Sequence, residues 1–358
     1  MIKKLLFLGM LFVALSGCGN EDSATVSELS GTRESDGQEA EVIAENLAIP
    51  WSIERHNEAF YISERGGTIA KISDGEVERQ SVSLERPLSS ASEAGLLGFV
   101  LYPDFSELQK GIAYYTYEDN GNRLNRIVEL TLANDEWQET AVLLDGIPSG
   151  STHHGGRIKI GPDKKIYATT GDASQPDLAQ DRDSLAGKIL RLNFDGSIPD
   201  DNPFSNSYVY SYGHRNAQGL TWSSDETMHA SEHGASANDE INRIREGRNY
   251  GWPDIEGSEE RDRMESPLFT SGNSQTWAPS GMAYKDEALY VAGLRGTAIL
   301  RFDLDSEEEK QVVNGFGRIR DVFIDGNTLY FVTNNRDGRG SPDNQDDRLV
   351  KVSLSSLD

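Results

Sequence analysis

The chain has 358 residues, with 34 Lys and Arg against 59 Asp and Glu, which gives a formal net charge of −25. A surface this acidic repels nucleic-acid phosphates and attracts cations, so nucleic acid is excluded as an expected partner and calcium is favoured. Cys18 is the only cysteine. No disulfide can form within the chain, and the fold must be held by its core.

The first 17 residues have the layout of a secretory signal, because Lys3 and Lys4 precede an apolar run over residues 5–15 that is too short to span a membrane as a helix. The run ends in Leu15-Ser16-Gly17-Cys18, which resembles the lipobox of bacterial lipoproteins. That resemblance implies that Cys18 is lipidated and becomes the new N-terminus. The alternative is an ordinary secretory signal followed by a stray thiol.

Residues 18–41 are polar, acidic and poor in aromatic residues, so they cannot bury enough surface to order themselves. We expect a disordered tether over 18–41 and one folded domain over 42–358. The protein is then expected to be exported and held by its lipid at the outer face of the cell membrane, or of the outer membrane if the host has one.

A short strand pattern with period two, usually containing an aromatic residue, recurs six times along the folded part. The segments begin at residues 60 (FYISERGG), 113 (AYYTYED), 166 (IYATTGD), 228 (MHASEHG), 289 (LYVAGLRG) and 329 (LYFVTNN). Spacings of about 40 to 62 residues are typical of propeller blades with some long loops. The pattern predicts an all-β, six-bladed β-propeller of four-stranded antiparallel blades; a β-sandwich is the alternative.

Several loops carry more polar residues than turns require, and a propeller would gather such loops at one mouth of its channel. In chain order they supply Glu93, the pair His153 and His154, Asp172, Arg215 and Asn216, the segment 231–244, Arg295, and Arg318 and Arg320. Converging guanidiniums need an anion, so we expect a small polyanionic ligand. A histidine oriented by a carboxylate, as Asp172 could orient His153 or His154, is the arrangement of a general base.

The motifs GLLGFVLYPDF, HGGRIKIGPDKKIYATTGD, AGKILRLNFDGSIPDDNPF, GHRNAQGL, EHG, DEIN, NYGWP, PSGMAY and GRIRDV occur in one order along residues 49–354. In this order they resemble the soluble pyrroloquinoline quinone (PQQ)-dependent aldose sugar dehydrogenases, the glucose/sorbosone dehydrogenase family. The resemblance implies a six-bladed propeller that oxidises an aldose at its anomeric carbon to a lactone. It also implies transfer of electrons to an external acceptor, either a quinone or a redox protein.

By the same resemblance, His153 is the base and Asp172 orients it. Glu93, Arg215, Asn216, Arg295, Arg318 and Arg320 contact PQQ, and the backbone carbonyls of Gly234 and Ala235 bind Ca²⁺. His153 would take the proton of the anomeric hydroxyl while a hydride passes to the quinone. Asp239 and Glu240 are either further calcium ligands or partners of the loop backbone.

Three positions depart from the glucose-oxidising members, namely Glu93 in place of glutamine, Thr152 in place of aspartate and Ala235 in place of proline. The acidic segment 334–348 lacks the ligand spacing of an EF-hand, and we expect a solvated loop there. Two other functions remain open, a calcium-dependent propeller lactonase and a non-catalytic propeller that binds carbohydrate or protein. The ring of arginines counts against the lactonase.

Overall fold

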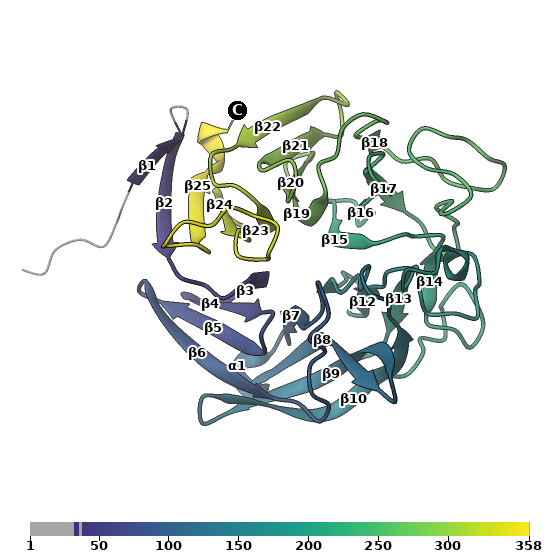
Figure 1. Cartoon of the computed structure of the whole chain (residues 1–358), viewed down its shortest axis with the longest axis horizontal. Coiled ribbons are helices and arrows are strands. Elements are labelled where there is room, and N and C mark those ends of the chain that lie inside the picture. The colour runs from purple at the N-terminus through teal and green to yellow at the C-terminus, as the bar shows by residue number, and fades with distance from the viewer. Residues whose placement is uncertain (1–31, 36–37, 358) are drawn as a thin grey trace, which may run out of the picture.

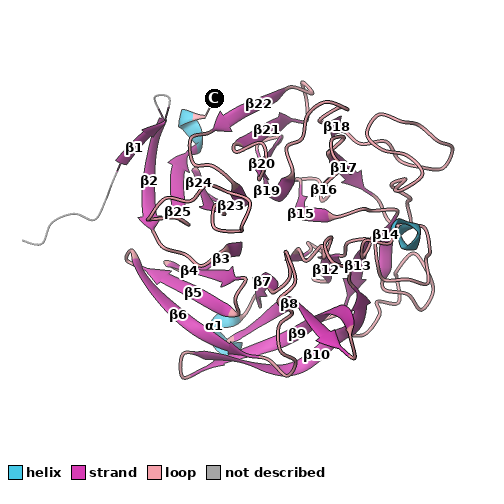
Figure 2. Ribbon diagram, viewed as in Figure 1, coloured by secondary structure: helices cyan, strands magenta, loops and turns pink. Residues whose placement is uncertain are grey.

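The structure is a computed structural model that describes residues 32–35 and 38–357. The expected signal over 1–17 and the lipidation site Cys18 lie outside the described residues. Within them, regular structure is almost entirely β (Figure 2). The helical elements are α1 (Phe105–Leu108) and two 3₁₀ turns, Pro176–Ala179 and Leu354–Ser356. None of the helices in the described part is long and apolar enough to cross a bilayer.

The strands form five sheets, three of which have four antiparallel strands in sequence order. The first is β11 (Ile158–Ile160), β12 (Ile166–Thr169), β13 (Lys188–Leu192) and β14 (Val209–Tyr212). The second is β15 (Ala217–Trp222), β16 (Met228–Glu232), β17 (Glu240–Ile244) and β18 (Phe269–Thr270). The third is β19 (Pro279–Lys285), β20 (Ala288–Gly293), β21 (Ile299–Asp303) and β22 (Glu309–Val313).

An eight-stranded sheet holds two further sets of four consecutive strands, joined where β6 and β10 pair in parallel. One set is β3 (Pro50–His56), β4 (Ala59–Glu64), β5 (Thr68–Ser73) and β6 (Glu76–Ser83). The other is β7 (Leu96–Leu101), β8 (Lys110–Asp119), β9 (Asn122–Ala133) and β10 (Glu136–Pro148). The last sheet has the order β1 (Thr32–Ser35), β2 (Gln38–Ala44), β25 (Leu349–Ser353), β24 (Thr328–Thr333) and β23 (Ile319–Asp325).

The sheets stand around a common centre as the blades of a β-propeller (Figure 1). Each first strand contacts the next first strand, in the order β3, β7, β11, β15, β19 and β23, and β23 returns to β3. The six recurring segments of the sequence fall on β4, β8, β12, β16, β20 and β24. Residues of β12 and β16 are buried throughout, because neighbouring sheets cover both of their faces, whereas the outer strand β6 alternates with solvent.

The ring is closed between the two ends of the described chain, where β2 pairs antiparallel with β25. Ala40 lies opposite Val352 and is buried, so the strand begins within the segment 18–41 that we expected to be a disordered tether. The boundary at residue 42 is therefore wrong by a few residues. The small apolar residues Ala40, Val42 and Ala44 alternate at period two, and this pattern suffices to hold the strand against β25.

Candidate active site

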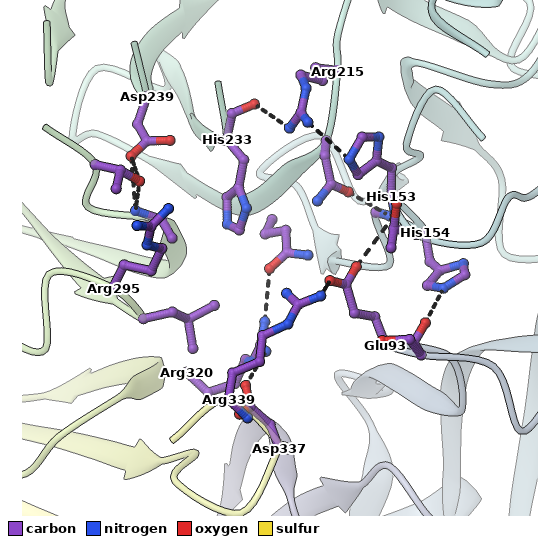
Figure 3. A pocket seen from close by; sticks show the side chains of 18 of the residues that line it. Glu93, His153, His154, Arg215, His233, Asp239, Arg295, Arg320, Asp337 and Arg339 are labelled. Carbon is purple, nitrogen blue, oxygen red and sulfur yellow. Dashed lines mark hydrogen bonds and ion pairs between the residues drawn. The ribbon is translucent and has the colours of Figure 1, made fainter. Parts of the chain in front are cut away.

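A cavity of about 470 Å³ opens on one face of the propeller (Figure 3). Its walls come from loops that precede a first strand or follow a second strand, and because neighbouring strands are antiparallel, these loops share one end of every sheet. Of the residues expected at a site, those lining the cavity are Glu93, His153, Arg215, Asn216, Gly234, Ala235, Asp239, Arg295, Arg318 and Arg320. Asp172 lies behind His153, and Glu240 lines a separate small hollow.

His153 and Asp172 form a hydrogen-bonded pair, with 2.7 Å between Nδ1 and Oδ1. Asp172 is fully buried, and its other oxygen accepts a hydrogen bond from Trp252 Nε1 at 2.9 Å. Nε2 of His153 lies 3.0 Å from Nη2 of Arg215. Because a guanidinium can only donate, Nε2 must be the acceptor and the ring proton must sit on Nδ1, facing the carboxylate. The unprotonated nitrogen thus faces the cavity.

The backbone conformation of the two loops brings His153 and Asp172 together. His153 has a φ of 61°, in the left-handed region that costs energy for a residue with a side chain. Gly171 directly precedes Asp172, and a Cβ there would lie 1.9 Å from the carbonyl oxygen of His153. The strands β11 and β12 return the chain to one end of the blade, and this glycine lets the two loops touch.

The neighbouring His154 is built into the wall. It is buried, its Nδ1 lies 2.7 Å from Ser149 Oγ, and its Nε2 donates to the carbonyl of Ser92 at 3.0 Å. Burial lowers the pKa of His154. Both ring nitrogens are already used, so this ring has no free nitrogen for a substrate.

Two buried arginines reach the cavity from β23 and the residue before it. Arg318 donates through Nε and Nη2 to Asp337 Oδ2, at 3.0 and 2.7 Å. Arg320 donates to Gln218 Oε1 at 2.8 Å, and its guanidinium lies over the ring of Trp51. Burial lowers the pKa of Arg320 to about 9, and Asp337 offsets this in part. Positive charge is therefore concentrated here at a cost that a bound anion would relieve.

The remaining expected cofactor contacts, Arg215, Arg295 and Asn216, also line the cavity. Arg215 bridges His153 Nε2 and the carbonyl of His233, and Arg295 is exposed at the side opposite His153. Asn216 lines the cavity while its side-chain oxygen accepts the N–H of Gly155 at 3.0 Å, so it also fixes the histidine loop.

Glu93 has a φ of 66° and contacts the histidine loop through the backbone N–H of His153, at 3.4 Å. Its other carboxylate oxygen forms an ion pair with Arg339. Burial acts to raise the pKa of Glu93, but Arg339 and the nearby histidines His154 and His233 outweigh it, so the pKa is lowered. Glu93 is accordingly a carboxylate at the rim of the cavity.

The two acids of the DEIN motif face different ways, as alternation along β17 requires. Asp239 accepts the N–H of Gly234 at 3.0 Å, and its other oxygen takes the N–H groups of Trp277 and Ala278, so both oxygens fix loop backbone. Glu240 is held by the N–H of Gly257 at 2.8 Å. Burial, together with the nearby charge of Glu232, raises the pKa of Glu240 to about 8.

No cluster of three or more His, Cys, Asp and Glu side chains in residues 32–35 and 38–357 is arranged to hold a metal ion. The expected calcium ligands at Gly234 and Ala235 are backbone carbonyls, and both residues line the cavity. The carboxylate of Asp239, which the sequence left open as a calcium ligand, is occupied by four hydrogen-bond donors, the three above and Thr276 Oγ1.

Sequence reasoning missed several lining residues, namely Trp51, Arg65, Asp337 and Arg339, whereas His233 lies in the segment 231–244 that was expected at the site. Burial lowers the pKa of His233 to about 4, which keeps its ring neutral. The lining then includes six guanidiniums, from Arg65, Arg215, Arg295, Arg318, Arg320 and Arg339, and three carboxylates, from Glu93, Asp239 and Asp337. The cavity carries an excess of three positive charges in a protein whose net charge is −25.

Fold and site together define a β-propeller with a cationic cavity whose wall includes a histidine hydrogen-bonded to a buried carboxylate. The family model for glucose/sorbosone dehydrogenases matches residues 47–344, and the chain belongs to that family. The aldose sugar dehydrogenase YliI of Escherichia coli is 30% identical over 346 residues, which cover 83% of this chain and 90% of that protein. Quinoprotein glucose dehydrogenase B of Acinetobacter calcoaceticus is 37% identical over 193 residues, covering 46% of this chain and 40% of that protein.

Among solved structures, the PQQ-bound aldose sugar dehydrogenase of Streptomyces coelicolor superposes with a TM-score of 0.82 at 36% identity, covering 87% of this chain and 96% of that one. The apo-form of the soluble aldose sugar dehydrogenase of E. coli superposes with a TM-score of 0.76 at 27% identity, covering 88% and 99%. These neighbours share the propeller.

Proposed function

We propose that this protein oxidises aldose sugars at the anomeric carbon to lactones with PQQ as its cofactor, and passes the electrons to an external quinone or redox protein. The observation that carries the proposal is the excess of three positive charges lining one cavity beside the unprotonated Nε2 of His153. Converging guanidiniums need an anion, and PQQ carries three carboxylates. The PQQ-bound relative from S. coelicolor supports the same choice.

The residues present fit this cofactor. A cavity of about 470 Å³ lies within the range of about 300 to 1,000 Å³ usual for small-ligand sites. Arg215, Asn216, Arg295, Arg318 and Arg320 would hold its carboxylates and carbonyls. When bound, the quinone supplies the acceptor for a hydride and its two electrons.

The protein's own contribution to the reaction is a base, held in one orientation. Asp172 accepts a hydrogen bond from Nδ1–H of His153, which keeps the ring proton on Nδ1 and leaves Nε2 to take the proton of the anomeric hydroxyl. The buried carboxylate then stabilises the imidazolium that forms. Arg215 must release Nε2 before a hydroxyl can reach it, and its guanidinium is then free to face developing negative charge.

Calcium belongs to the same proposal. The carbonyls of Gly234 and Ala235 would bind it at the cavity wall, where its charge would add to that of the arginines. Gly234 also lines the small hollow that contains Glu240, so the loop that would supply these carbonyls borders both spaces.

Two further expectations stay proposals. Counting β3–β6 and β7–β10 as separate blades makes the propeller six-bladed. A lipid on Cys18 would attach the mature chain to a membrane face, and we expect Cys18→Ser to move the exported protein from the membrane fraction to the soluble fraction. Mass spectrometry of the mature N-terminus would contradict this proposal if it found an unmodified Cys18.

The test is dye-linked oxidation of a panel of aldoses by the protein, with PQQ and Ca²⁺ added separately and together. Turnover that requires both additions, with the lactone identified as product, is the expected result. Quenching of tryptophan fluorescence reports PQQ binding independently, because Trp51 lines the cavity. Saccharide binding without turnover, and without quenching by PQQ, would instead favour a non-catalytic binding propeller.

A further inference from the structure

The acidic loop over residues 334–348, between β24 and β25, turns toward the cavity. We expected a solvated loop there, but Asp337 and Arg339 line the cavity wall (Figure 3). The base of the loop is fixed by Arg348, which binds Asp343 at 2.6 Å and Asp346 at 3.0 Å. Residues 336, 338, 339 and 341–345 are exposed, so the segment is largely the solvated loop that we expected, and Asp337 and Arg339 are its contribution to the cavity wall.

The part of the loop nearest the cavity is tied to the arginines of β23. Asp337 Oδ2 accepts two hydrogen bonds from Arg318, and Asp337 Oδ1 accepts the backbone N–H of Arg339 at 2.8 Å. A Cβ at Gly340 would lie 2.4 Å from the carbonyl oxygen of Asn335, so the chain is packed tightly on both sides of Arg339. This residue is consequently held at a fixed place over the cavity.

From that place Arg339 pairs with Glu93, which lies 246 positions earlier in the chain, in the loop before β7. The other oxygen of Glu93 contacts the backbone of His153. The side chain of Arg339 is 54% exposed and that of Glu93 24%, whereas Arg318 and Arg320 are buried. The pair therefore stands at the opening, next to the base and above the cationic floor.

We propose that Arg339 is a specificity-determining residue that donates hydrogen bonds to the ring hydroxyls of the sugar, with Glu93 as the adjoining acceptor. This inference rests on the proposed function. A molecule whose anomeric hydroxyl meets His153 Nε2 extends toward the opening, where a fixed guanidinium and a carboxylate lie side by side. Polyols suit such a pair, because each hydroxyl both donates and accepts. The buried arginines remain available to the anionic cofactor.

The experiment compares Arg339→Gln and Arg339→Lys with the wild type in the presence of PQQ and Ca²⁺. Saturation-transfer NMR titration with D-glucose measures sugar binding, quenching of tryptophan fluorescence measures the Kd for PQQ, and dye-linked turnover gives KM and kcat. For Arg339→Gln we expect sugar affinity to fall and KM to rise by about ten- to a hundredfold, as for loss of a charged hydrogen bond. The Kd for PQQ should stay within about twofold, and Arg339→Lys should keep part of the affinity.

Arg263→Gln is the matched control, since Arg263 is an exposed arginine on a loop away from the cavity, and it should change none of these values. Unchanged sugar affinity in Arg339→Gln, or a parallel loss of PQQ affinity, would overturn the inference. A loss that vanishes in a Glu93→Gln background would also overturn it, because Arg339 would then act only through Glu93. Arg339-dependent glucose binding without any turnover would refute the proposed function alone.

Discussion

Two histidine–carboxylate pairs of similar geometry sit close together along the chain but do different work. His153 binds Asp172 through Nδ1 at 2.7 Å, and His214 binds Glu232 through Nδ1 at 2.8 Å. The side chain of His153 is 20% exposed and its Nε2 is bonded to Arg215, a side chain that lines the cavity, whereas His214 is fully buried, with Nε2 bonded to Ser211 and its ring stacked on Tyr250. The two pairs differ in what surrounds the second ring nitrogen, and for this reason we propose a catalytic role for His153 and a structural role for His214.

The largest effect should follow from removing the accessible ring. His153→Ala removes the proton acceptor, and we expect kcat to fall by about a hundred- to ten-thousandfold while the unfolding temperature hardly changes. Steady-state turnover together with thermal unfolding of the same sample measures both. Turnover near the wild-type value would show that proton abstraction is performed elsewhere.

A third histidine, the buried His229, should make the stability of the fold depend on pH. Burial lowers the pKa of His229 to about 4, so in acid the unfolded chain takes up a proton that the folded ring refuses. The neutral ring's contribution is fully present above about pH 6.5 and is lost as pH falls toward 4, by about 3 kcal/mol in all. Urea unfolding at several pH values should show a shallower acid loss for His229→Gln than for the wild type. Parallel pH curves would refute the assignment.

Replacing His214, the histidine of the buried pair, should lower the free energy of unfolding and have only a small effect on kcat. His214→Gln leaves Glu232 and Ser211 with poorer partners in the core, and we expect about 2 kcal/mol less free energy of unfolding. Glu232 also accepts the backbone N–H of Arg215, so a modest fall in kcat should accompany the loss. A His214→Gln variant as inactive as His153→Ala, with an unchanged free energy of unfolding, would contradict a purely structural role for His214.

The smallest effect is expected at Trp252, which donates a hydrogen bond to the second carboxylate oxygen of Asp172. Trp252→Phe deletes one hydrogen bond to Asp172 while keeping an aromatic ring, and a single such bond contributes about 1 kcal/mol. We expect kcat to fall about three- to tenfold, with no change in the Kd for PQQ. Steady-state kinetics beside a PQQ titration would measure this, and an unchanged kcat would mean that His153 and the backbone N–H of Ser174 suffice to orient Asp172.

Local pattern predicted the blades and indicated that Asp172 lies near the histidine pair, and the structure places it against His153. Each recurring strand carries its own period-two signal, and HGGR and TGD bracket β11 and β12, so the return of the chain could be read from spacing alone. The residues that were missed depend on distant contacts. Asp337 and Arg339 line the cavity because a loop without periodicity folds back over it, and nothing near residue 339 in the sequence points to Glu93.

The two acids of the DEIN motif, Asp239 and Glu240, could be assigned only in part from the sequence. The sequence left Asp239 and Glu240 equivalent, although neighbouring residues of a strand face opposite sides. Alternation predicts that only one of them can line the cavity. Which one does so depends on the register of β17 against β16, and that register is set by packing between sheets.

The pairing of β2 with β25 also has a consequence for the order of folding. Ala40 meets Val352, so this seam joins two segments that lie far apart in the sequence. Bringing them together carries the loop-closure entropy of some 300 intervening residues, which makes it a late and slow event. The loop that carries Asp337 and Arg339 leads directly into β25. We therefore expect these two residues to take their places at the cavity only when β2 pairs with β25.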